Sequence, residues 1–170
     1  MQVYLISGLS GTGKTTLGNA LSGLGHEVID MDSQFGYDGN VQTEDPIDMP
    51  APPTKDWFVD NGWIWSSHAL EPILKAPRDK PLFLCGGSRN ESKFYSLVDT
   101  IFVLHVPDHV MRTRLMARND PHTSSELIIT RMIEFNQQTY KRALVNGGHI
   151  IETTEPIDVC VTNILERIGS

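Results

Sequence analysis

The chain has 170 residues, of which 39% are hydrophobic and 21% charged, and its formal net charge is −7 at pH 7. This length predicts about one domain with an adequate core, and the acidic balance argues against nucleic acid as a principal partner. The two cysteines lie at no metal-ligand or redox spacing. No apolar stretch reaches about 20 residues, and none follows a secretory-signal pattern. We therefore expect a cytoplasmic protein without a membrane partner.

The first 24 residues predict a strand, a turn and a helix in succession. Residues 3–7 form an apolar run typical of a strand buried on both faces, and apolar residues then recur at helical spacing up to Leu24. Between them, residues 8–15 contain a glycine, four residues, then Gly-Lys and a hydroxyl residue. In this context the pattern predicts a loop whose N–H groups, with the following helix, hold phosphate oxygens.

The residue types of this loop suit a nucleoside triphosphate bound with magnesium. Lys14 would reach the β- and γ-phosphates, and Thr15 would place its hydroxyl on Mg²⁺. The alternative is a glycine-rich turn that binds nothing, which the strand–loop–helix context disfavours. The expected nucleotide-binding residues of this segment are Gly8, Ser10, Gly11, Thr12, Gly13, Lys14, Thr15 and Thr16.

Residues 27–32 predict a second strand that ends in two acids, Asp30 and Asp32. Asp32 is suited to hold a water of Mg²⁺ or to orient and deprotonate an acceptor hydroxyl, and Asp30 could share that task. The alternative is that either carboxylate only caps a turn.

A long excursion follows, which we expect to be a mobile acceptor-binding segment over residues 33–75. Glycines and prolines break regular structure up to about residue 56. Residues 57–75 are predicted to be helical, divided or shortened at Gly62 and Pro72, with Trp57, Asn61 and Trp65 on one face. The aromatic residues here either pack the excursion onto the core or line a site for a base, a sugar or another flat molecule. Between residues 34 and 71 there are seven acids and one basic residue, Lys55, a balance that disfavours a dianionic acceptor.

Three further strands are expected at residues 81–87, 100–106 and 149–153, and helices follow them. Apolar strands alternating with helices predict an α/β fold with a parallel sheet covered on both faces. Ligands in such sheets bind at the carboxyl ends of the strands. This rule places residues 86–89 and 153–156 beside the loop and the paired acids. Asp32, Gly86, Gly87 and Arg89, together with Trp57 from the aromatic part of the excursion, are therefore the expected acceptor-binding residues.

The helix predicted at residues 108–118 carries Arg114 and Arg118 four residues apart, on one face, just before a polar break at residues 119–125. Two such arginines suit a lid that neutralises charge on a transferring phosphoryl group, and Arg131 could join them. The alternative is a solvated basic face with surface ion pairs.

In this order, the loop, the paired acids, Gly86-Gly87, the arginine helix and residues 153–156 resemble small P-loop kinases of the shikimate, adenylate and cytidylate kinase type, and among these the substrate-unassigned bacterial kinase-like ATPases. The resemblance implies a three-layer α/β sandwich around a five-stranded parallel sheet, a single domain over residues 1–170, and ATP with Mg²⁺. It also implies a short lid at residues 118–126 and an adenine site formed by the lid arginines and residues 153–156, with Arg114, Thr154 and Pro156 as nucleotide-binding residues. The chain departs from these kinases in having no arginine before Arg78, which leaves Arg89 and Lys55 as the nearby candidates for binding an anionic group.

The sequence therefore predicts an ATP- and Mg²⁺-dependent kinase, monomeric or homodimeric. Its small-molecule acceptor is expected to be a neutral or cationic hydroxyl compound and not a dianion. Lys14, Asp30, Asp32, Arg114 and Arg118 are its expected catalytic residues, with Thr15 and Asp32 at the metal. One alternative is an ATP-binding sensor module whose excursion is read by a partner protein. Another is a nucleoside monophosphate or shikimate-type kinase with a non-standard acceptor site.

Overall fold

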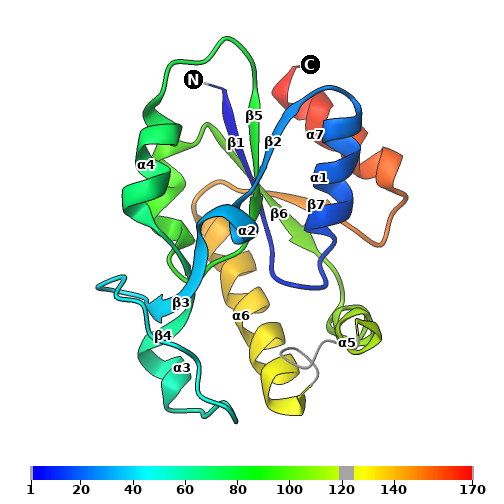
Figure 1. The fold of residues 1–170 in the computed structure, drawn as a ribbon. Helices are drawn as coiled ribbons and strands as arrows, with labels where there is room; N and C mark the ends of the chain where they lie inside the picture. The colour runs from blue at the N-terminus through cyan, green and yellow to red at the C-terminus, as the bar shows by residue number, and fades with distance from the viewer. Residues whose placement is uncertain (1, 119–124, 170) are drawn as a thin grey trace.

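A five-stranded sheet forms the centre of the computed structural model, which describes residues 2–118 and 125–169 (Figure 1). Its strands follow the order β2-β5-β1-β6-β7, and every neighbouring pair is parallel. These strands are β1 (Val3–Ser7), β2 (Glu27–Asp30), β5 (Leu82–Gly86), β6 (Thr100–His105) and β7 (His149–Glu152). The predicted fold class is confirmed.

Helices cover both faces of this sheet, as Figure 1 shows. Alternate residues of β1 point to opposite sides, because side chains along a strand alternate. Tyr4 and Ile6 pack with the helices α1 (Lys14–Gly23) and α7 (Ile157–Ile168). Val3 and Leu5 belong to the core under α4 (Ser67–Lys75), the 3₁₀ helix η1 (Glu91–Leu97) and α6 (Glu126–Val145).

Two more helices flank the carboxyl edge of the sheet. The helix α2 (Met31–Phe35) directly follows β2, and α5 (Asp108–Ala117) packs against α6. None of the helices in the described part of the chain has the length and apolar character of a membrane span.

The excursion contains an antiparallel hairpin of β3 (Gly36–Asn40) and β4 (Asn61–Trp65), with α3 (Trp57–Asp60) just before β4. In Figure 1 the hairpin and α3 lie to one side, beside α6. The predicted helix over residues 57–75 is therefore wrong across β4. Ile64 and Trp65 are buried there while Trp63 is exposed, and pairing with β3 outweighs the helical spacing of the aromatic residues.

The carboxylate of Glu44 ties this hairpin to the rest of the molecule. Its oxygens accept hydrogen bonds from the Ser67 N–H at 2.9 Å, the Ser67 hydroxyl at 2.6 Å, the Lys93 ammonium at 2.8 Å and the Asn90 amide at 3.2 Å. Burial raises the pKa of Glu44, but the bonds from Lys93 and Ser67 together outweigh burial and lower it to about 2. The hairpin is thus fixed by a half-buried polar anchor.

Candidate active site

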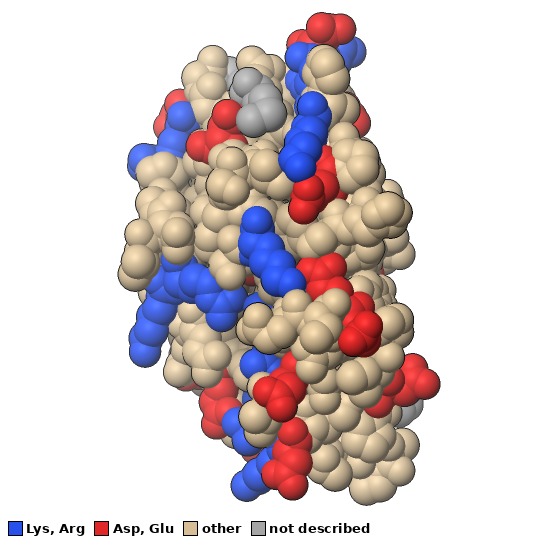
Figure 2. Space-filling model, turned by 90° about the vertical axis from the view of Figure 1, so that its left-hand side faces the viewer, with Lys and Arg blue, Asp and Glu red and all other residues tan. Residues whose placement is uncertain are grey.

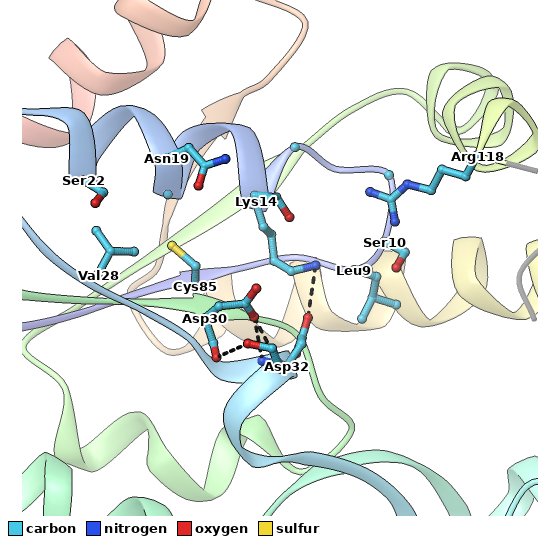
Figure 3. Close-up of a pocket in the computed structure, with 15 residues that line it drawn as sticks. Leu9, Ser10, Lys14, Asn19, Ser22, Val28, Asp30, Asp32, Cys85 and Arg118 are labelled. Atoms are coloured by element: carbon cyan, nitrogen blue, oxygen red, sulfur yellow. Dashed lines mark hydrogen bonds and ion pairs between the residues drawn. The ribbon is translucent and has the colours of Figure 1, made fainter. Parts of the chain in front are cut away.

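The predicted phosphate loop lines a cleft of about 380 Å³ at the carboxyl edge of the sheet, which we call the donor cleft (Figure 3). Among the predicted nucleotide-binding residues, those that line it are Ser10, Gly11, Gly13, Lys14 and Thr15. Gly8 and Thr12 are buried behind the loop, and Thr16 is exposed on α1. Figure 3 shows Lys14 extending toward Asp32, and Arg118 pointing from the end of α5 toward Ser10.

The backbone of the loop is shaped to hold an anion. Gly11 and Gly13 adopt φ values of 89° and 102°, which L side chains rarely adopt. In the described structure no side chain caps the N-terminus of α1, and its first turn has no acidic residue. The free N–H groups of that turn and the positive end of the helix dipole therefore face the cleft, which fits a phosphate.

Arg114 contacts the back of the loop. Its guanidinium donates to the Gly11 carbonyl at 3.2 Å and to the Thr153 carbonyl at 2.9 Å. The Thr153 hydroxyl in turn donates to the Thr12 carbonyl at 2.6 Å. Arg114 and Arg118 therefore lie in different surroundings, because Arg114 binds the carbonyls behind the loop while Arg118 lines the cleft.

The structure describes only part of the residues that were predicted to form the adenine site and the lid. Thr154 and Pro156 are exposed and follow Thr153, outside the described lining of the donor cleft. Most of the predicted lid, residues 119–124, lies outside the described residues. Arg131 is on α6, where it forms an ion pair with Glu134 at 2.7 Å.

Asp32 has its two carboxylate oxygens in different environments. Oδ1 accepts hydrogen bonds from the Trp65 indole N–H and from the Gly87 N–H, both at 3.1 Å. Oδ2 faces the ammonium of Lys14 at 3.5 Å. A carboxylate oriented by two donors on one oxygen leaves the other available to a metal ion or a hydroxyl.

Asp30 has a structural role that corrects the predicted end of β2. Its Oδ1 accepts from the N–H groups of Asp32 and Ser33, both at 3.1 Å, so it caps α2. The strand therefore ends at Asp30 instead of continuing to Asp32. Asp30 also lines the donor cleft.

The turn after β5 passes very close to the loop. A Cβ on Gly87 would lie 2.2 Å from the Gly8 carbonyl oxygen, so only glycine fits this approach. A Cβ on Gly86 would lie 2.5 Å from the indole of Trp65. Both glycines, predicted as acceptor-binding residues, have this packing role, and Gly87 also lines the cavity described next.

A second cavity, of about 390 Å³, lies beside the donor cleft and shares Leu9, Ser10 and Asp32 with it. We call it the acceptor cavity, after the role that the sequence predicts for the segment that lines it. Its apolar wall comes from the excursion and from α6, and consists of Met49, Trp57, Phe58, Trp63, Ile128, Met132 and Phe135. Trp57 was expected here from the sequence, and its ring packs edge-on against Phe58 at 5.1 Å.

Three arginines also line the acceptor cavity: Arg89, Arg131 and Arg142. Arg89 donates to the carbonyls of Phe58 and Asn61, both at 2.6 Å, and its guanidinium lies 4.8 Å from the Phe135 ring centre. Burial, and then the nearby Arg142 guanidinium, lower the pKa of Arg89. Arg89 therefore holds α3 against α6.

The arginines of this cavity correct one premise of the sequence analysis. Lys55 is exposed, so Arg89 and Lys55 are not the pair of candidates for an anionic group, and Arg131 and Arg142 join Arg89 instead. Together with Asp32 and Asp38, the described lining holds three positive and two negative side chains. On the face that Figure 2 shows, basic and acidic side chains are likewise interspersed.

Sequence reasoning missed Trp65 and Arg142 as site residues. Trp65 was placed on a helix with Trp57, although the aromatic and β-branched run Trp63-Ile64-Trp65 was a signal for a strand. Arg142 carried no signal, because it reaches the cavity from the last turns of a helix far along the chain.

No protein-family model and no curated protein sequence matches this chain. Solved structures do. A shikimate kinase from Acinetobacter baumannii, in complex with shikimate, superposes with a TM-score of 0.60 at 16% identity, covering 99% of this chain and 94% of its own. A sugar kinase from Janibacter sp. gives a TM-score of 0.61 at 14% identity, covering 99% of this chain and 95% of its own.

A deoxyadenosine kinase from M. mycoides, with bound dATP, gives a TM-score of 0.56 at 11% identity and covers 100% of both chains. These proteins act on different acceptors, and their sequences are far from this one. The likeness therefore shows the fold, and the chain has the P-loop kinase fold.

Proposed function

We propose that this protein is an ATP- and Mg²⁺-dependent phosphotransferase that moves the γ-phosphoryl group to a hydroxyl of a small acceptor. The observation that carries the proposal is the position of Asp32, which lines both the donor cleft and the acceptor cavity. A group at that junction can contact a phosphate on one side and a hydroxyl on the other. The kinase neighbours support the same class of reaction.

The residues of the donor cleft would act by positioning and by charge stabilisation. The loop N–H groups and Lys14 would hold the phosphates, and Arg118 would neutralise charge on the transferring group. Arg114 would act through the loop carbonyls that it holds. Thr15 and Asp32 would hold Mg²⁺, which supplies neutralisation of the phosphate oxygens when bound.

Transfer would then proceed in line. The acceptor oxygen forms a bond to the γ-phosphorus while the bond to the bridging oxygen breaks, and ADP leaves. The hydroxyl proton passes to Asp32 or through it to solvent. Asp30 would support this step by holding the backbone of Asp32 in place.

The acceptor cavity limits the charge of the acceptor. Arg131 is already paired with Glu134, and Arg89 donates to carbonyls, while Asp32 and Asp38 add negative charge. This balance suits a hydroxyl compound that is neutral or carries one negative charge, and it disfavours a dianion. The aromatic wall suits an acceptor with an apolar or flat face.

The test is a panel of acceptors incubated with Mg·ATP. Nucleosides, sugars, sugar acids and amino sugars represent the favoured classes, and nucleoside monophosphates represent dianions. ADP formation and the ³¹P resonance of a new phosphomonoester identify the product. Asp32→Asn should abolish turnover while ATP binding is kept. Asp48→Asn, which changes an exposed acid of the excursion, should leave turnover unchanged.

Three outcomes would contradict the proposal in different ways. Rapid phosphorylation of nucleoside monophosphates would overturn the proposed acceptor charge. If no compound in the panel accelerates ADP formation, the proposal that the protein is a kinase is wrong. If ATP then altered hydrogen exchange in β3 and β4 without turnover, the sensor alternative would replace it.

A further inference from the structure

The indole of Trp65 occupies an unusual place for a core side chain. Trp65 is fully buried, yet its Nε1–H reaches 3.1 Å from Oδ1 of Asp32, the carboxylate at the junction of the two cavities. Trp65 belongs to β4, so this contact links the acceptor-side hairpin directly to the proposed reaction centre.

The contact is held in place from several directions. The backbone N–H of Trp65 donates to the Asn90 side chain at 3.0 Å, and the Asn90 amide donates back to the Trp65 carbonyl at 2.8 Å. The indole also packs over Gly86, where a Cβ would lie 2.5 Å away, and next to the Phe94 ring at 6.0 Å. The indole therefore has little freedom to turn its N–H elsewhere.

The same hydrogen bond determines which oxygen of Asp32 faces the cleft. With Trp65 and Gly87 both donating to Oδ1, rotation of the carboxylate is restricted and Oδ2 is directed toward Lys14 at 3.5 Å. A carboxylate that rotated freely would spend part of its time with neither oxygen directed toward Lys14. Donors that orient a reacting group contribute to catalysis by preorganisation.

We infer that Trp65 is a positioning residue for Asp32, acting through its indole N–H. The inference rests on the proposed function, because Asp32 has its role there. It predicts that Trp65→Phe, which keeps an aromatic ring but lacks the N–H, impairs turnover without weakening ATP binding. It also predicts that the effect needs the Asp32 carboxylate.

The first test uses the ligand-free protein. Its three tryptophans give three indole ¹H–¹⁵N resonances, and Trp65→Phe identifies the one from Trp65. We expect this resonance to lie downfield and to move more than the other two in Asp32→Asn. A Trp65 resonance that is unaffected by Asp32→Asn would overturn the inference, whether or not the protein is a kinase.

The second test measures turnover of Mg·ATP, with water or an identified hydroxyl compound as acceptor. Trp65→Phe should lower kcat about tenfold to a hundredfold, with an unchanged KM for ATP. In an Asp32→Asn background the same change should have no further effect.

Phe83→Leu is the matched control, because Phe83 is as fully buried as Trp65 but belongs to the core cluster that packs with α1 and α7, on the other face of the sheet. It should lower thermal stability as Trp65→Phe does while keeping kcat near that of the wild type. An equal loss of kcat in the two variants would overturn the inference and leave only a packing role. Absence of turnover in the wild-type protein would instead contradict the proposed function.

Discussion

The donor cleft and the acceptor cavity share a wall but are built in different ways. The donor cleft depends on one continuous segment, residues 8–15, whose backbone and helix end provide the binding groups. The acceptor cavity gathers side chains from the loop, the hairpin, the turn after β5 and α6. Backbone chemistry leaves a sequence pattern because it needs glycine at fixed positions, whereas a cavity of side chains depends on packing between distant segments.

This difference predicts that changes on each side affect different measurements. Substitutions in the donor cleft should alter ATP binding and transfer, and substitutions in the acceptor cavity should alter the response to acceptor. Asp32 and its neighbours are where the two effects meet. The following experiments test that separation.

The largest effect is expected for Lys14→Met, which removes the cation beside the phosphates. Turnover should fall by about two to three orders of magnitude, the scale for loss of one charge-stabilising donor. Steady-state ADP formation gives the rate, and titration calorimetry gives the ATP affinity. Lys75→Met, on an exposed residue of α4 that pairs with Glu71, should change neither quantity. If the Lys14 variant kept full turnover, the loop would have no role in the reaction.

Next in size is Glu44→Gln, which should destabilise the fold by about 1–2 kcal/mol at pH 7, because solvent screens part of the interaction at this half-buried carboxylate. The pKa of Glu44 is about 2 in the folded protein, below its ordinary value of 4.5, so its stabilisation is present above pH 4.5. That stabilisation should disappear as the pH falls toward 2. Urea unfolding of both proteins at pH 7 and pH 3 measures the difference.

Glu71→Gln provides the matched control for this prediction. Its carboxylate is 45% exposed, against 17% for Glu44, and it forms a surface ion pair with Lys75. Such pairs contribute about 1 kcal/mol or less. Equal losses in the two variants would show that the anchor of the hairpin is no stronger than a surface contact.

A smaller, selective effect is expected for Trp63→Ala in the acceptor cavity. Trp63 is 41% exposed, so its truncation should cost little stability while removing an aromatic surface from the acceptor. The KM for the acceptor should rise about tenfold and the KM for ATP should stay constant. Trp63→Phe should restore most of the loss. A raised KM for ATP would contradict the prediction that changes in the acceptor cavity leave ATP binding unaffected.

The smallest effect is expected at Cys85, which lines the donor cleft. Burial raises the pKa of its thiol to about 12, so the thiolate is nearly absent at pH 8. Native protein should therefore resist alkylation of Cys85 by iodoacetamide, as measured by mass spectrometry, whereas urea-unfolded protein should react. Rapid alkylation of the native protein would show that this wall of the cleft opens to solvent.

The sequence was sufficient for the sheet and for the loop. Apolar runs that alternate with helical spacings predicted all five parallel strands. Helices cover both faces of this sheet, so its central strands β1, β5 and β6 are strongly apolar. The glycine pattern predicted which segment would form a phosphate-shaped loop. In both cases the information is local.

The hairpin could not be predicted in the same way. β3 reads Gly-Tyr-Asp-Gly-Asn, a composition with low strand propensity, and it pairs with β4 across a long intervening segment. Arg142 and Trp65 become site residues only through that pairing and through the packing of α6. The roles of the predicted site residues remain predictions for the experiments above.

The contact between Trp65 and Asp32 has a consequence for redesign of acceptor specificity. Exchanging the hairpin for that of another protein of this fold would replace its part of the acceptor wall and the indole donor together. A chimaera would then inherit a misaligned carboxylate even where its new pocket fitted the new acceptor. Grafts that retain Trp65, Asn90 and Gly86 while varying the outward face of β4 offer a route by which selectivity could change and the reaction centre stay intact.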